Sequence, residues 1–220
     1  MSTDLKCQIA AYTAVHGEFS VVDVPPLDYL MVDGHGDPNT SAAYRDAIAS
    51  IYPLAYGLKF LSKRELGRDH VVMPLEALCW SADMAAFTTG RDKSSWNWTV
   101  MVMVPEWITR DHLETVRGAA GRKAGPMTAD VRLERLVEGW CVQTLHIGSY
   151  DDEAPVLAAM HDEFIPGHAL RMTGRHHEVY LSDARRTSPD RLRTILRQPV
   201  ADASDEPSRG GRTVGAKITP

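Results

Sequence analysis

The chain has 220 residues, of which 44% are hydrophobic and 24% charged, and its formal net charge is −5 at pH 7. This length and apolar content suffice for one domain with a sizeable core, and no run approaches the roughly 20 apolar residues of a membrane span. The acidic balance disfavours a protein that holds nucleic acid directly through a clustered basic face.

The first half of the sequence predicts the order strand, helix, strand, strand. Residues 1–20 precede it as a weakly patterned N-terminal extension, with a short helix expected around Ile9 to Ala14. Pro53 should kink or divide the first long helix. The polar connection that contains Gly90, Arg91 and Asp92 separates the two later strands. From spacing and composition, the segments are an extended run at 21–24, a strand at 27–33, a turn at 34–39, a helix at 41–61 and strands at 71–81 and 95–105.

The second half repeats this order after a helix and a glycine-rich link. Its helix is marked by apolar side chains at helical spacing, at Val156, Leu157, Met160 and Phe164. The tail 201–220 is polar, without periodicity, and is expected to be disordered. The other segments are the linking helix at 109–120, a long strand or strand pair at 131–147, a turn at 148–153, a strand at 176–181, a turn at 183–189 and a last strand at 192–200.

The repeated order predicts an α+β fold built from two tandem strand–helix–strand–strand modules, about residues 21–107 and 130–200. We expect an antiparallel sheet with helices on one face and a central pseudo-twofold cleft. Glu76 and Glu178 each fall on the strand that follows a helix, so both are candidates for the cleft.

Strand alternation brings acids and aromatic rings together. His176, Glu178 and Tyr180 point to one side of their strand, and Glu76 shares a side with Trp80. A glutamate among such rings is typical of a box that holds a flat or cationic ligand. The alternative is structural, because Arg185, Arg186 and Arg193 can pair with Glu178 and because tryptophans often belong to the core.

Other kinds of site are disfavoured. His176 and His177 point to opposite faces of a strand, and neither HExxH nor GxSxG occurs, so we expect no metal, no cofactor and no serine hydrolase. The cysteines Cys7, Cys79 and Cys141 are odd in number and widely spaced, which favours buried, reduced thiols. The N-terminus lacks the pattern of a signal peptide, so a cytoplasmic location is expected.

Several strings resemble one branch of the GyrI-like family. They are Asp28-Tyr29-Leu30 with Gly34-His35-Gly36-Asp37-Pro38-Asn39, Leu75-Glu76-Ala77-Leu78-Cys79-Trp80, Trp96-Asn97-Trp98, the run from Glu138 to Glu153, His176-His177-Glu178-Val179-Tyr180-Leu181-Ser182-Asp183, and Leu192-Arg193-Thr194-Ile195-Leu196-Arg197. The resemblance spans roughly residues 22–200. Val179 and Ala184 depart mildly from the pattern and affect packing and the turn.

This resemblance implies a small-molecule-binding domain with a ligand cleft between two modules. Similar domains are effector sensors in multidrug-responsive transcription regulators. Without a helix-turn-helix partner, this chain resembles stand-alone members, some of which are similar to hydrolases that open the cyclopropane ring of DNA-alkylating natural products. Glu178 matches the pocket glutamate of the family, and Trp80, Trp98 and Tyr180 match its aromatic surround.

Two functions follow as hypotheses. In detoxifying hydrolysis, Glu178 with a raised pKa is the general base, Tyr180 or His146 donates to the developing oxyanion, and tryptophans stack on the substrate. In the alternative, a sensing or sequestering protein, Glu178 is the counter-ion of a cationic or planar hydrophobic ligand. A contact with DNA gyrase is ranked last. The remaining ligand-binding candidates are Glu76, Trp80, Trp98, His146, Tyr150 and His176.

Overall fold

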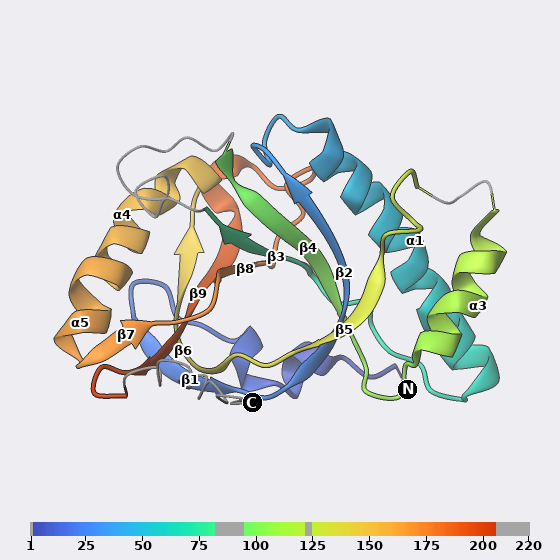
Figure 1. Ribbon diagram of the computed structural model, residues 1–220, viewed down its shortest axis with the longest axis horizontal. Coiled ribbons are helices and arrows are strands. Elements are labelled where there is room, and N and C mark those ends of the chain that lie inside the picture. The colour runs from blue at the N-terminus through green and yellow to red at the C-terminus, as the bar shows by residue number, and fades with distance from the viewer. Residues whose placement is uncertain (1, 82–94, 122–124, 206–220) are drawn as a thin grey trace, which may run out of the picture.

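A computed structural model describes residues 2–81, 95–121 and 125–205 (Figure 1). Its centre is an antiparallel sheet in which the strands lie in the order β1-β6-β9-β8-β3-β4-β2-β5, while β7 pairs with the far end of β9. The strands are β1 Ser20–Val24, β2 Leu27–His35, β3 Leu75–Trp80, β4 Asn97–Val104, β5 Arg132–Leu136, β6 Gly139–Ile147, β7 Leu170–Met172, β8 His176–Tyr180 and β9 Arg193–Asp202.

The strand order has an internal twofold relationship. The trio β2-β4-β3 of the first module is repeated in reverse as β8-β9-β6 of the second, and the two trios meet where β3 pairs with β8. The edge strands complete the pattern, because β1 pairs with β6 and β5 pairs with β2. The predicted α+β fold of two strand–helix–strand–strand modules is confirmed.

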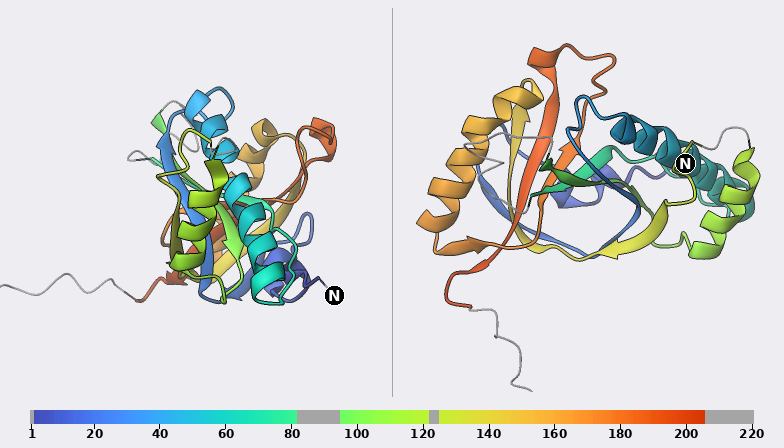
Figure 2. Two further views of the ribbon diagram at one scale, coloured as in Figure 1. Left: turned by 90° about the vertical axis from the view of Figure 1, so that its right-hand side faces the viewer. Right: turned by 45° about the horizontal axis from the view of Figure 1, so that its top comes forward.

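The α-helices cover one face of the sheet (Figure 1 and Figure 2). α1 (Ala42–Glu65) and α3 (Arg110–Ala120) lie at one end, and α4 (Ala154–Ala158) and α5 (Ile165–Gly167) lie at the other (Figure 2). Short 3-10 helices at Leu5–Cys7 and Ala10–Tyr12 precede β1. Two more lie at Tyr150–Glu153, before α4, and at Pro189–Arg191, before β9. No helix in the described ranges is both long and apolar enough to span a bilayer.

α1 is positioned by signals that the sequence carries. The side chain of Ser41 accepts a hydrogen bond from the backbone N–H of Tyr44, which caps the helix start. Ile51, Leu54 and Leu58 recur at helical spacing and are fully buried against the sheet. The helix runs through Pro53 without being divided and ends at Glu65, four residues beyond the expected end.

The helix expected after Tyr150 is not one regular α-helix. A π-helical stretch at Ala159–Phe164 lies between α4 and α5, and prolines stand in the first turn of each of these α-helices. Because the π-turn adds a residue to the 3.6-residue repeat, both Met160 and His161 are buried. β7 was not expected. The polar connection around Gly90 and residues 206–220 of the predicted tail lie outside the described residues.

Candidate functional site

A cavity of about 870 Å³ lies between α1 and the centre of the sheet. Its walls come from α1, from β3 and β8 at the junction of the modules, from the 3-10 helix Tyr150–Glu153 and from the loop that follows β8. Its aromatic lining consists of Tyr44, Tyr52, Tyr56, Trp96, Tyr150 and Tyr180. The carboxyl groups among the lining residues belong to Glu153, Glu178 and Asp183.

Glu178 lies at this wall in the middle of β8. Only 7% of its surface is exposed. The Tyr180 hydroxyl donates to Oε2 of Glu178 at 2.7 Å, and Nε2 of His176 lies 3.6 Å from Oε1. These residues alternate along one strand, so their side chains stand on the same face. The shared side that the sequence predicts for these three side chains is therefore the side that lines the cavity.

The neighbours of Glu178 are held in neutral forms. Burial, followed by the charge of Glu178, raises the pKa of Tyr180 well above its usual value, so Tyr180 keeps its proton and can donate it. Burial, with the nearby rings of His161 and His177, lowers the pKa of His176 to about 3, so its imidazole is neutral at physiological pH. The carboxylate therefore has two neutral polar neighbours along its own strand.

Tyrosines build the aromatic wall. The Tyr44 hydroxyl donates to that of Tyr180 at 3.5 Å, and the ring of Tyr150 meets the ring of Tyr180 edge to face at a centroid distance of 5.5 Å. Burial and the charge of Glu178 raise the pKa of Tyr150 to about 12. The three phenol rings thus surround the carboxylate with flat, protonated surfaces that can stack on a ligand.

Trp98 supports this wall from behind. Its side chain is fully buried, and its ring meets Tyr44 edge to face at 5.0 Å. The indole lies directly over Gly34, where an added Cβ would come within 1.9 Å of the ring. The indole N–H donates to the carbonyl of Gly36. Trp98, one of the expected ligand-binding residues, therefore lies in the core beneath the cavity lining.

Other predicted site residues lie elsewhere. Glu76 is on the opposite face of the sheet, because Ala77 pairs with Glu178 while Glu76 pairs with Val179. Trp80 lines a second, smaller cavity, with the guanidinium of Arg175 stacked 3.7 Å from its ring centroid. The ring of His146 contacts the carbonyl of Ser149 through Nε2 at 3.0 Å. Glu178, Tyr180, Tyr150 and His176 remain together at the main cavity.

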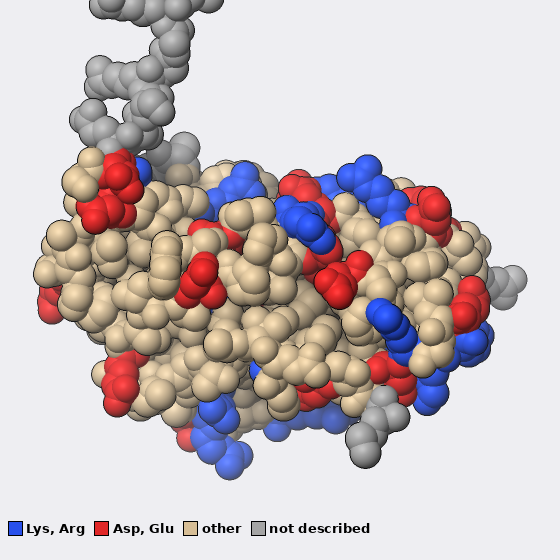
Figure 3. Space-filling view, turned by 90° about the horizontal axis from the view of Figure 1, so that it is seen from below, with Lys and Arg blue, Asp and Glu red and all other residues tan. Residues whose placement is uncertain are grey.

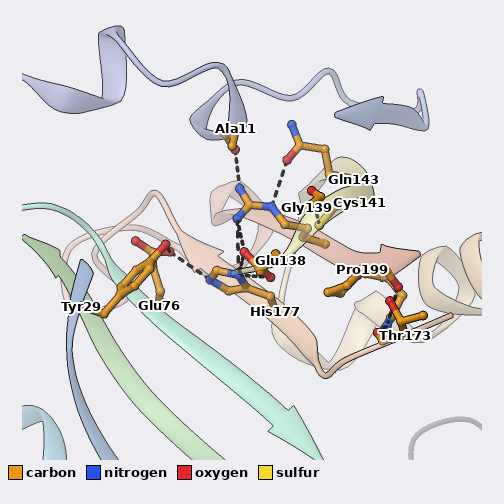
Figure 4. Close-up of polar contacts among 12 residues, drawn as sticks. Ala11, Tyr29, Glu76, Glu138, Gly139, Cys141, Gln143, Thr173, His177 and Pro199 are labelled. Atoms are coloured by element: carbon orange, nitrogen blue, oxygen red, sulfur yellow. Dashed lines mark hydrogen bonds and ion pairs between the residues drawn. The ribbon is translucent and has the colours of Figure 1, made fainter. Parts of the chain in front are cut away.

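Glu76 belongs to a buried polar network, part of which Figure 4 shows. Tyr12 and Tyr29 donate to its two oxygens at 2.6 and 3.3 Å, and Nε2 of His177 lies 2.9 Å from Oε2. Nδ1 of His177 lies 3.0 Å from a carboxylate oxygen of Glu138. Both ring nitrogens therefore face carboxyl groups, which favours the doubly protonated, cationic imidazole.

Arg197 completes this network. It donates to Glu138 at 3.2 Å, to the side chain of Gln143 and to the carbonyl of Ala11. The carboxylates of Glu138 and Glu76 outweigh the effect of burial and raise the pKa of His177, while His177 and Arg197 lower the pKa of Glu138 to about 2. The network thus pairs two carboxylates, those of Glu76 and Glu138, with two cations, His177 and Arg197. Its hydrogen bonds to Tyr12 and Ala11 attach the N-terminal segment to the sheet.

Part of the site was not found from the sequence. Tyr44 falls in the predicted helix at 41–61, and Trp96, Glu153 and Asp183 fall in the strings of the family resemblance, but none of the four is among the predicted site residues. The pairing of Glu138 with Arg197 joins residues 59 positions apart. Periodicity reports on local structure only, so only the fold reveals these partners.

The described residues give no sign of a metal centre or of a broad basic surface on the face in view. No group of three or more His, Cys, Asp or Glu side chains gathers to hold an ion within the ranges that the structure describes. On the face in Figure 3, acidic and basic side chains are scattered among uncharged ones, without a continuous basic stripe.

The sequence matches a known protein family, and the fold is similar to solved structures. Residues 17–201 match the GyrI-like small molecule binding domain family. An uncharacterized conserved protein from Listeria innocua is 35% identical, over 91% of this chain and 100% of that one, with a TM-score of 0.81. A hydrolase from Listeria innocua is also 35% identical with the same coverages and a TM-score of 0.78.

More distant structures share the fold alone. The C-terminal domain of EcmrR is 9% identical over 84% of this chain and 98% of that one, with a TM-score of 0.51. Among curated proteins, no sequence matches this chain.

Proposed function

Since the chain belongs to the GyrI-like small molecule binding domain family, we propose that its main cavity binds a planar hydrophobic ligand and that Glu178 acts there as a general base in hydrolysis. The observation that carries this proposal is a buried carboxylate at the wall of a cavity of about 870 Å³ lined by aromatic rings. The similarity to a Listeria innocua protein described as a hydrolase supports the choice of reaction class.

The proposed reaction opens the cyclopropane ring of a DNA-alkylating compound of the duocarmycin type. Such a ring is conjugated to a carbonyl group. Glu178 removes a proton from water as the water oxygen bonds to a ring carbon. The ring C–C bond breaks, its electron pair moves through the conjugated system to the carbonyl oxygen, and that oxygen then takes up a proton. The sum is substrate plus water, with no other reactant needed.

Tyr180 is proposed to link the uptake of a proton by Glu178 to the stabilisation of the negative charge on the substrate oxygen. In the resting site its hydroxyl donates to Oε2 of Glu178 at 2.7 Å. When Glu178 takes a proton it loses its charge, and the hydrogen bond that it accepts weakens. At that moment the negative charge appears on the substrate oxygen, which then becomes the stronger acceptor for the Tyr180 hydroxyl.

Binding in this proposal relies on the cavity tyrosines. Tyr44, Tyr150 and Tyr180 present ring faces and edges beside Glu178, and Trp96 adds an indole to the lining. Flat rings of a substrate gain from stacking on such groups and from leaving water. Trp80 and Trp98, which the sequence favoured for stacking, are outside this lining, so the proposal assigns the role to the tyrosines.

A second candidate function is binding without chemistry, in a sensing or sequestering protein. The observation that favours it is a second buried carboxyl group, Glu153, in the lining with Glu178. Two carboxyl groups among aromatic rings suit a cationic planar ligand, which gains both charge pairing and cation–π contacts. In this reading Glu178 is a counter-ion and the ligand leaves unchanged.

The two functions are separated by incubating the protein with a duocarmycin-type compound and, separately, with the stable cationic dye rhodamine 6G. Hydrolysis predicts a ring-opened product by mass spectrometry, with the rate reduced on the order of 10²–10⁴ in Glu178→Gln. Glu134→Gln, an exposed substitution on β5, is the matched control and should keep the wild-type rate. Complete recovery of the intact compound with the dye bound would favour the second function.

A further inference from the structure

A second cavity of about 290 Å³ adjoins the main one. Cys79 and His176 line both cavities and therefore form the wall between them. The rest of the smaller cavity comes from the π-helical stretch, from the end of β3, from the β7–β8 connection and from β9, through His161, Trp80, Arg175 and Gln198. Neither the family assignment nor the proposed reaction gives this space a role.

Buried imidazole nitrogens at this cavity have no hydrogen-bond partner within the described residues. They are Nδ1 and Nε2 of His176 and Nε2 of His161. The His176 side chain is 6% exposed, and the nearest carboxylate oxygen, from Glu178, lies 3.6 Å from Nε2, beyond hydrogen-bond distance. A buried polar group without a hydrogen bond is unfavourable, so such groups call for a bound water or ligand group.

Both histidines are brought here by specific local structure. The π-turn at Ala159–Phe164 buries His161, and the ring of His161 meets the ring of His176 edge to face at a centroid distance of 6.0 Å. Single π-turns inside α-helical segments frequently occur at functional sites. Burial lowers the pKa of His161, as it does that of His176, so both rings are neutral.

We propose that the second cavity is a binding subsite for a small, neutral, planar group that carries both a hydrogen-bond donor and an acceptor, such as an aromatic carboxamide. A neutral imidazole offers one N–H donor and one acceptor nitrogen, so His161 and His176 together match the N–H and C=O of an amide. Trp80, held by the stacked guanidinium of Arg175, supplies a flat wall for the attached ring.

The charge of the surroundings favours a neutral group. The guanidinium of Arg175 lies over Trp80, and Oε1 of Glu178 lies 3.6 Å from Nε2 of His176, so a positive and a negative charge near this cavity offset each other. A charged ligand group would lose its hydration shell beside two neutral rings without a net opposite charge to offset that cost. This inference rests on the proposed function, because the group is taken to be one end of a ligand whose other end occupies the main cavity beyond His176.

The test uses benzamide as the probe, with the histidine ring resonances of the full chain followed by NMR. Benzamide should shift the His161 and His176 ring signals in a saturable titration. His161→Phe keeps a flat ring but removes the nitrogens, and it should weaken benzamide binding roughly three- to tenfold, as for the loss of one hydrogen bond. His168→Phe, an exposed substitution just after α5, is the matched control and should bind as the wild type does.

Rhodamine 6G reports on the main cavity in the same samples and keeps the two proposals distinguishable. Dye binding without any benzamide-induced shift of either histidine would overturn the second subsite and leave the main site standing. Benzamide binding without dye binding would overturn the main site and leave the second subsite standing. If His161→Phe does not fold, His161→Asn with a crystal structure in benzamide replaces it, and benzamide found away from both histidines would equally overturn the inference.

Discussion

Glu76 and Glu178 stand on paired strands but face opposite sides of the sheet. The register of β3 and β8 pairs Ala77 with Glu178 and Glu76 with Val179. Glu178 therefore lies at the cavity, and Glu76 lies among Tyr12, Tyr29 and His177 beneath the N-terminal segment. The two glutamates are offset by one residue in this register, so the Glu178 carboxylate lies on the face of the cavity and the Glu76 carboxylate lies on the face of the buried polar network.

This separation predicts different consequences for the same substitution. Glu76→Gln removes the buried carboxylate beside the His177 cation and should lower the free energy of unfolding by roughly 3–5 kcal/mol. Glu178→Gln should cost less stability and instead weaken the binding of rhodamine 6G. Urea denaturation and dye titration of both variants check the assignment. Equal losses of stability, or loss of dye affinity in Glu76→Gln alone, would contradict it.

The charge of His177 predicts a fall in stability on the alkaline side. Its pKa is raised in the folded protein, chiefly by Glu138, against the opposing effect of burial. The folded state holds this proton more tightly, so the stabilisation is complete below the unfolded pKa of about 6.5 and is lost as pH rises through the folded pKa. Urea unfolding at a series of pH values above about 6.5 should show the decline. His177→Gln should lack it, and an unchanged slope in that variant would refute the assignment.

His176 predicts the opposite sign on the acid side. Burial lowers its pKa to about 3, so below about 6.5 the unfolded chain binds the proton first. The free energy of unfolding should therefore fall as pH drops from about 6.5 to about 5, a range above that in which Glu138 titrates. His161 and His70 contribute in the same direction. In His176→Gln the decline should be shallower, whereas a slope equal to that of the wild type would argue against a buried neutral imidazole.

The sequence predicts the fold well and the site only in part. The order of strands and helices follows from local patterns, namely the helical spacing of apolar residues in Ala42–Glu65 and the run of aromatic, β-branched and other apolar residues in Asn97–Val104. Strand pairing is not local, and the prediction from the sequence that Glu76 shares a cleft with Glu178 is therefore wrong. The π-turn that buries His161 has no compositional signal, and Tyr44 reads as an ordinary core residue of α1 until the sheet is in place.

Gly34 is predicted to be essential for the aromatic wall. A Cβ at this position would lie 1.9 Å from the ring of Trp98, which supports Tyr44. Gly34→Ala should lower the free energy of unfolding by about 1–3 kcal/mol through overpacking, and it should weaken dye binding by displacing Tyr44. Gly118→Ala in α3 has open space around its added methyl group and should be neutral or stabilising. Urea denaturation compares the two, and equal stability would rule out the proposed close contact.

The most direct test of Glu178 as the base is the single-turnover rate of ring opening in water labelled with ¹⁸O. The wild-type protein should yield a ring-opened product that carries one labelled hydroxyl oxygen. Glu178→Gln should bind the compound but form the product on the order of 10²–10⁴ times more slowly. An unchanged rate in Glu178→Gln, or a product without the label, would contradict the account.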